Sequence, residues 1–165
     1  MGNYRKDNME EKYYTPDYMV EELFKLKDKY VDFEITEYLE NSAGGGSIVD
    51  KFDKPYKAYD IINETGREDI IECDYLKEKI EYKKGRVTIM NPPFNKGLKF
   101  LYKSLKEGDY TIALLSQNSL LNIDYSKVWV EEIQLWKKVT FGDACVNVIL
   151  VACRNKKEDD RYEYE

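Results

Sequence analysis

An apolar run meets two consecutive prolines at residues 86–94, which read RVTIMNPPF. Residues 86–90 carry the β-branched and apolar side chains typical of a buried strand. The strand has to stop at Asn91, because a residue before proline is pushed to extended geometry and proline cannot donate a hydrogen bond to a sheet. Asn91 is therefore predicted to lie at the carboxyl edge of a buried strand.

Further strands and helices are predicted on both sides of this segment. Six more apolar runs have strand length: 35–39, 55–60, 70–74, 110–115, 133–141 and 146–152. The last two flank Gly142-Asp143, a hairpin signal, and only a loop joins the second and third. Apolar residues at helical spacing predict helices over 15–29 and 96–105, and a short helix is expected over 47–52.

The first helix has a recognisable start. Thr15, Pro16 and Asp17 supply a capping hydroxyl, a first-turn proline and an acidic residue. Helices and short loops between seven buried strands predict an α/β, Rossmann-like domain on a mostly parallel seven-stranded sheet, closed by a C-terminal antiparallel hairpin.

A chain of 165 residues is long enough to form one domain with a sizeable core. We expect this domain to span residues 13–155. Residues 1–12 are polar without periodicity and are expected to form a flexible lead, and residues 156–165 a charged tail.

Composition excludes several classes of function. The chain contains no histidine, which excludes histidine triads and histidine zinc sites, and no metal site is expected. The chain has three cysteines, Cys73, Cys145 and Cys153, each in an apolar run. An odd number at wide spacing is typical of a reduced cytoplasmic protein and not of a disulfide framework. No apolar run is long enough to span a membrane. The net charge of −6 denies nucleic acid a global attraction, so any such contact must be local or assisted by a partner.

Polar or glycine-rich residues follow four of the predicted strands: residues 40–46 (ENSAGGG), Asp60, Asp74 and Asn91. In open α/β sheets, ligands bind beyond the carboxyl ends of the strands. Glycine lets the backbone approach a ligand, and an acid at the second strand end can accept both hydroxyls of a ribose. This set predicts a nucleoside-containing cofactor. Taken singly, the glycines also fit a tight turn, and the two acids fit turn caps about equally well.

Three motifs together resemble a known family. Asn91-Pro92-Pro93-Phe94, the loop at 40–46 and the segment at 14–16 resemble S-adenosylmethionine-dependent amino-methyltransferases, specifically the N6-adenine DNA methyltransferases. That family carries Asp/Asn/Ser-Pro-Pro-aromatic, a SAGxG-like loop and a Tyr/Phe-x-Thr-Pro-like segment. The resemblance covers residues 13–154. It departs at Asn41, where proline is commoner, and in the missing helix between the second and third strands.

The resemblance implies S-adenosylmethionine as cofactor and a role for each matching position. Asp60 matches the acid that binds ribose, and Asp74 matches the acid that holds the adenine amine. The implied cofactor-binding residues are Tyr14, Thr15, Pro16, Glu40, Ser42, Ala43, Gly44, Gly46, Asp60, Asp74, Tyr75 and Asn91. The implied catalytic residues are Asn91, Pro92, Pro93 and Phe94, and the implied substrate contacts are Phe94 and Lys96. Phe141 and residues 146–151 resemble the family's closing hairpin.

The motif suits methyl transfer to an aromatic amine, whose lone pair is delocalised into the ring. The Asn91 side-chain oxygen and the Pro92 carbonyl can hold the two amine hydrogens and favour a pyramidal nitrogen. Phe94 offers a face on which an extruded base can stack. Lys96, Lys99 and Lys103 follow the motif and are either phosphate contacts or a solvated helix face.

We therefore expect an adenine-specific DNA methyltransferase of the compact kind that phages and mobile elements carry. An RNA adenine methyltransferase, a protein-glutamine methyltransferase and a non-catalytic cofactor-binding subunit stay open as alternatives. In the family, a target-recognition domain would follow the last hairpin, where only about ten residues remain. DNA is accordingly expected as a weakly bound partner, with a specificity partner or a homodimer supplying recognition, and no membrane is expected to be involved.

Overall fold

A computed structural model describes residues 14–157 and 160–162 of the chain. The predicted flexible lead at residues 1–12 lies outside this part. Seven strands form a single sheet: β1 (Glu37–Glu40), β2 (Tyr56–Asp60), β3 (Ile70–Glu72), β4 (Arg86–Met90), β5 (Tyr110–Ser116), β6 (Val128–Phe141) and β7 (Ala144–Asn155). Within these described residues, two α-helices accompany the strands: α2 (Asp17–Tyr30) and α3 (Gly97–Glu107).

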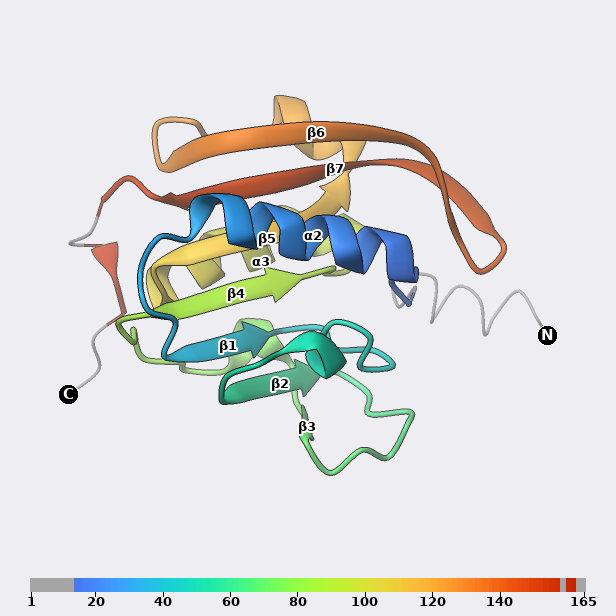
Figure 1. Cartoon of the computed structure of the whole chain (residues 1–165), viewed down its shortest axis with the longest axis horizontal. Helices are drawn as coiled ribbons and strands as arrows, with labels where there is room; N and C mark the ends of the chain where they lie inside the picture. The colour runs from blue at the N-terminus through green and yellow to red at the C-terminus, as the bar shows by residue number, and fades with distance from the viewer. Residues whose placement is uncertain (1–13, 158–159, 163–165) are drawn as a thin grey trace.

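The sheet has the order β3-β2-β1-β4-β5-β7-β6. Strands β1 to β5 run parallel, and β7 is inserted antiparallel between β5 and β6 (Figure 1). The prediction of a mostly parallel seven-stranded sheet with a C-terminal hairpin is confirmed. The chain leaves β1 toward β2 on one side, whereas β4 lies on its other side. This reversal of strand order opens a crevice at the carboxyl ends of the strands, where ligands of such sheets bind.

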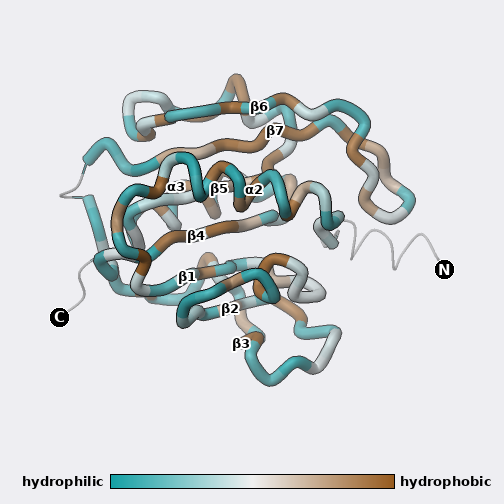
Figure 2. Tube along the Cα trace, in the orientation of Figure 1, coloured by the Kyte–Doolittle hydropathy of each residue, from teal (hydrophilic) through white to brown (hydrophobic). Residues whose placement is uncertain are grey.

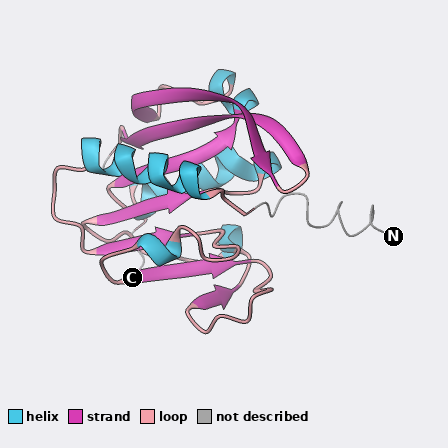
Figure 3. Cartoon of the chain, turned by 45° about the vertical axis from the view of Figure 1, so that its right-hand side comes forward, coloured by secondary structure: helices cyan, strands magenta, loops and turns pink. Residues whose placement is uncertain are grey.

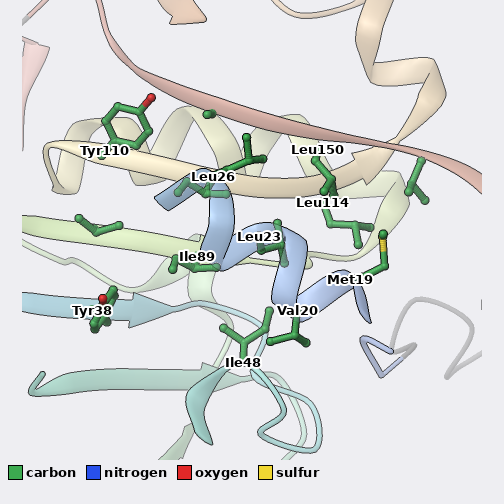
Figure 4. Packing of buried hydrophobic residues seen from close by; sticks show 14 of the residues in the cluster. Met19, Val20, Leu23, Leu26, Tyr38, Ile48, Ile89, Tyr110, Leu114 and Leu150 are labelled. Carbon is green, nitrogen blue, oxygen red and sulfur yellow. The ribbon is translucent and has the colours of Figure 1, made fainter. Parts of the chain in front are cut away.

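One helix covers each face of the sheet. Alternate residues of a strand point to opposite faces, so Ile89 packs under α2 while Met90 packs under α3. Figure 4 shows Leu23 of α2 beside Ile89 and Leu114, all fully buried. In Figure 2, β4 and β7 are mostly hydrophobic, whereas α2 alternates along its length, as expected for strands buried on both faces and a helix buried on one.

The start of α2 differs from the prediction. Its N-cap is Pro16, without any side-chain cap, and the Pro16 carbonyl accepts hydrogen bonds from the amides of Met19 (2.9 Å) and Val20 (3.1 Å). The predicted capping role of Thr15 is therefore wrong. Its hydroxyl instead accepts a hydrogen bond from Asn91, 76 positions along the chain.

Other element boundaries shift for local reasons. Only residues 49–51 of the predicted helix over 47–52 are helical, as a single 3-10 turn. Strand β6 begins at Val128, five residues before the predicted start, and its pairing with β7 is irregular at two places. The predicted loop between β2 and β3 is confirmed, since residues 61–69 contain no helix. The predicted hairpin is also confirmed, with Phe141 paired to Ala144.

The chain past β7 returns to the amino edge of the sheet. The Tyr162 amide donates to the Lys106 carbonyl (2.8 Å), and Arg161 pairs with Asp109 (2.9 Å) over the ring of Tyr82. Cys73, Cys145 and Cys153 are free thiols. In the part of the chain just described, neither α-helix is long and apolar enough to cross a membrane.

Candidate active site

A cleft opens at the carboxyl edge of β1, β2 and β4, the edge that Figure 3 turns toward the viewer. It is lined by Asn41, Ser42, Gly44, Asp60, Ile61, Asp74, Tyr75, Asn91, Pro93, Lys96 and Phe100. Eight of these residues carry roles implied by the sequence: Ser42, Gly44, Asp60, Asp74, Tyr75, Asn91, Pro93 and Lys96. Residues spread over 54 positions of sequence thus meet at one site.

The glycine-rich loop forms one wall of the cleft. Gly44 has a φ of +55°, a conformation that side chains rarely adopt. A Cβ on Gly44 would lie 3.1 Å from Cδ1 of Tyr14, whose ring packs against the loop. The Ala43 amide donates to the Tyr59 carbonyl of β2 (2.8 Å), which fixes the loop to the sheet. The glycines of the loop leave room for the ring of Tyr14, which covers the loop.

Two acids stand at adjacent strand ends beside this wall. The buried Asp60 carboxylate accepts a 2.6 Å hydrogen bond from the Gly44 amide. Asp74 accepts a 3.1 Å bond from the Leu76 amide and so caps the 3-10 turn at 75–77. Both acids therefore have a structural role as well as a place in the cleft. A carboxylate has about four acceptor positions, so a turn contact leaves capacity for a ligand.

Glu40, the last residue of β1, is 1% exposed and lies outside the cleft lining. Its carboxylate accepts a 2.9 Å hydrogen bond from the Ser42 amide. Burial raises the pKa of Glu40 to about 8, and the bonds from Ser42 oppose the shift only in part. Burial therefore favours the protonated form of the Glu40 carboxyl group.

Asn91 is fixed to two other parts of the site. Its Nδ2 group donates to the Thr15 hydroxyl (2.9 Å), and its carbonyl accepts from the Ser42 hydroxyl (2.9 Å). Asn91 and Thr15 are each 8% exposed. These bonds tie the start of α2, the glycine-rich loop and the end of β4 together, and they hold the Asn91 amide in one orientation at the cleft.

The rest of the motif turns the chain from β4 into α3. Pro92 is buried, Pro93 lines the cleft, and the Pro93 carbonyl accepts a 3.0 Å bond from the Lys96 amide. Phe94 packs edge-on against Phe141 of β6, with ring centroids 5.9 Å apart at 86°. Phe94 is half-buried at the margin of the α2-side core, next to the cleft lining and not within it.

The side chain of Tyr75 is held by a buried polar network with two residues of α3. Its hydroxyl donates to Glu107 of α3, and Lys103 pairs with the same carboxylate while its ammonium lies 4.0 Å from the centre of the Tyr75 ring. Burial raises the pKa of Glu107, and the charge of Lys103 opposes this shift. The Lys103 side chain is 10% exposed, so the predicted solvated face is wrong for this residue.

The structure places the remaining implied residues around the cleft, outside its lining. These are Tyr14, Thr15, Pro16, Glu40, Ala43, Gly46, Pro92 and Phe94. Gly46 has a φ of +90°, and a Cβ there would lie 1.9 Å from Nη1 of Arg67. This glycine makes room for the Arg67 guanidinium, which pairs with Asp50 (2.9 Å) and Asp69 (2.8 Å).

Three lining residues were missed by the sequence-based prediction: Asn41, Ile61 and Phe100. Ile61 follows Asp60 directly, and its side chain is exposed at the cleft. Asn41 is 2% exposed; its Nδ2 lies 3.1 Å from the Met90 sulfur, and its Oδ1 has no hydrogen-bond partner. An unsatisfied buried acceptor in a cleft lining fits a ligand that brings a donor.

Within the described ranges, no cluster of three or more histidine, cysteine, aspartate or glutamate side chains is arranged to hold a metal ion. The cleft offers carboxylates, amides, a hydroxyl, the Lys96 ammonium, backbone groups and aromatic faces to a ligand. Such groups bind the hydroxyls, amines and flat ring of a nucleoside.

Comparison with solved structures finds the same fold in methyltransferases. PH1948 from Pyrococcus horikoshii, assigned to the RNA methyltransferases, has a TM-score of 0.65 at 16% identity, over 87% of this chain and 86% of that one. The 23S rRNA methyltransferase ErmE has a TM-score of 0.56 at 11% identity, over 88% and 70%. The methyltransferase subunit of a type I restriction-modification system from Streptococcus thermophilus has 0.61 at 12%, over 88% and 45%.

The TM-scores of 0.56–0.65 show that the chain has the Rossmann-like methyltransferase fold, and at identities of 11–16% they show the fold alone. No protein-family model matches the sequence, and a search of curated proteins finds no match. The assignment of chemistry therefore depends on the residues of the cleft.

Proposed function

We propose that this chain transfers a methyl group from S-adenosylmethionine to the exocyclic N6 amine of adenine in DNA. The observation that carries the proposal is the position of Asn91-Pro92-Pro93-Phe94 at the carboxyl end of β4, with Asn91 held by Thr15 and Ser42 beside the cleft. The methyltransferase fold of the structural neighbours and the resemblance of the motif support it.

The cleft residues fit the proposed cofactor. Bound there, S-adenosylmethionine would supply a methyl group made electrophilic by its sulfonium. Asp60 would accept the ribose hydroxyls and Asp74 the adenine amine, while Ile61 and Tyr75 would contact the adenine ring. The unsatisfied Asn41 oxygen gives the cleft one more acceptor for an N–H or O–H group.

Asn91 and Pro92 would position the target amine. The amide of Asn91 donates through Nδ2 to Thr15, and this orientation supports a role for its Oδ1 as the acceptor of one amine hydrogen. The Pro93 carbonyl is bonded to the Lys96 amide, so the Pro92 carbonyl is the better second acceptor. Two acceptors favour a pyramidal nitrogen with its lone pair directed at the methyl group, and most of the catalysis is then positioning.

The base itself would meet Phe94. The edge-on contact with Phe141 fixes the ring of Phe94 while leaving it half-buried. A fixed aromatic face next to the cleft suits stacking of a base extruded from a duplex, which contributes about 1–3 kcal/mol per base.

RNA adenine is the second candidate acceptor, because two of the structural neighbours are named as RNA methyltransferases. A planar amide, as in protein glutamine, also suits the same two acceptors. The net charge of −6 predicts weak duplex binding that falls with salt, so a specificity partner or a homodimer would supply sequence recognition.

The test is to incubate the protein with methyl-labelled S-adenosylmethionine and equal amounts of duplex DNA, single-stranded DNA, RNA and lysate protein. We expect label in DNA, recovered as N6-methyladenine after digestion to nucleosides, and a rate of labelling about two to three orders of magnitude lower with Asn91→Ala. Label recovered only in RNA or protein would transfer the assignment to that acceptor. Cofactor binding without transfer to any acceptor would indicate a non-catalytic subunit.

A further inference from the structure

The hairpin formed by β6 and β7 extends beyond the rest of the sheet at the edge that carries the cleft. The last residue of β5, Ser116, pairs with Val148, which in turn faces Trp136 of β6. Residues 137–147 therefore project past the end of β5, as Figure 1 shows. We call this part, residues 137–147, the overhang.

The overhang is anchored to the proposed active site at two points. Phe141 is fully buried and packs against Phe94 of the motif. At the base of the overhang, the ring of Trp136 lies 6.5 Å from that of Tyr18, in the first turn of α2. The same end of α2 is preceded by Thr15, the partner of Asn91. The position of the overhang relative to the motif is thus fixed by packing.

A β-bulge at the base of the overhang carries two adjacent lysines. Between the pairs Trp136–Val148 and Val139–Val146, two residues of β6 oppose the single residue Asn147 of β7. These two residues are Lys137 and Lys138, and both are exposed. Among the described residues, neither lysine takes part in an ion pair.

The backbone at the bulge is strained. Lys138 has a φ of +57°, where a residue with a Cβ is disfavoured by about 1–2 kcal/mol. The Asn147 side chain stabilises this conformation, because its Oδ1 accepts a 3.0 Å hydrogen bond from the Lys138 amide. Glycine would fit the same position without strain. A lysine at this position therefore lowers the stability of the fold, and the bulge sets the direction in which its charged side chain leaves the strand.

We infer that Lys137 and Lys138 bind the phosphate backbone of the nucleic acid next to the target base. This inference rests on the proposed function, because the strand would reach the overhang only if its base enters the site beside Phe94. Two exposed ammonium groups at the base of the overhang would supply a local attraction that the net charge of −6 denies to the molecule as a whole.

The test uses Lys138→Gly with Lys137→Gln, singly and together, and measures kcat/KM for methyl transfer to a short duplex against salt concentration. Each lost phosphate contact should lower the salt slope by about 0.9, which is about eightfold in affinity at 0.1 M salt. Cofactor affinity should stay at the wild-type value. Lys84→Gln is the control, since it removes an exposed lysine before β4, at the opposite edge of the sheet.

Stability separates this inference from a folding defect. Lys138→Gly should unfold at the same or a higher temperature than the wild type, because it removes the strained conformation, and yet it should bind nucleic acid less well. A double variant with the wild-type salt slope, while the wild type methylates nucleic acid, would overturn the inference and leave the proposed function intact. Methylation confined to protein by the wild type would overturn both.

Discussion

The hydrogen bond between Asn91 and Thr15 gives the most direct test of the proposed mechanism. Both residues are 8% exposed, and the 2.9 Å bond from Asn91 Nδ2 to the Thr15 hydroxyl orients the amide at the cleft. Thr15→Val keeps the shape of the side chain but removes the acceptor. Thr15→Ser keeps the acceptor and serves as the matched control.

The magnitude follows from the ordinary value of one hydrogen bond. A neutral bond of this kind contributes about 0.5–1.5 kcal/mol net, so losing the orientation it enforces should lower kcat by about 2- to 13-fold. Loss of this buried hydrogen bond should also lower the free energy of unfolding by about 1–3 kcal/mol. For a chain of this size, that corresponds to roughly 2–4 °C in melting temperature per kcal/mol.

The assay compares kcat, cofactor affinity and melting temperature for the wild type, Thr15→Val, Thr15→Ser and Asn91→Ala. We expect Asn91→Ala to lower kcat by about two to three orders of magnitude with little effect on cofactor affinity. In the Asn91→Ala background, Thr15→Val should have no further effect on kcat, because both changes act through one amide. Independent, additive effects, or an unchanged kcat in Thr15→Val, would refute the positioning role of Thr15.

Three further outcomes follow from the site. Asp60→Ala should weaken S-adenosylmethionine binding by about 1.5–3 kcal/mol in calorimetry, and unchanged affinity would mean that the ribose contact is misassigned. Burial raises the pKa of Glu40 from 4.5 to about 8, so the folded chain retains a proton that the unfolded chain loses. As the pH rises from about 5 to 8, the free energy of unfolding of the wild type should fall by up to about 5 kcal/mol relative to that of Glu40→Gln. Urea unfolding at a series of pH values measures both, and the same pH dependence in the two proteins would contradict this. Gly46→Ala should lower the melting temperature more than Gly66→Ala, because both have positive φ but only Gly46 would overlap Arg67; equal losses would argue against that contact.

Local sequence patterns were sufficient to predict the architecture. Strands β4 and β5 are short apolar runs that are buried almost throughout, and such a run can be recognised as a strand without knowledge of its neighbours. The edge of the sheet that carries the site was also predictable, because Asp60, Asp74 and Asn91 each lie at or just past the end of a strand and the carboxyl ends of parallel strands lie together. The hairpin turn at Gly142-Asp143 is equally local.

Side-chain partners could not be predicted in the same way. The hydroxyl of Thr15 suits a helix cap by its position in sequence, yet it accepts a hydrogen bond from Asn91, 76 residues away. Lys103 has the spacing of an exposed helical lysine, yet it lies over Tyr75 and pairs with Glu107. In both cases a distant element supplies a partner that the local pattern does not contain.

The sequence by itself thus determined the order and type of the elements, the parallel sheet and the edge at which the polar residues gather. Tertiary structure alone decided that Asn41 has an unsatisfied oxygen in the cleft, that Gly46 makes room for Arg67, and that Lys138 sits in a strained bulge. The physical reason is that periodicity records which face of an element is buried. The contacts of a side chain depend instead on how distant elements are placed against one another, which no local pattern records.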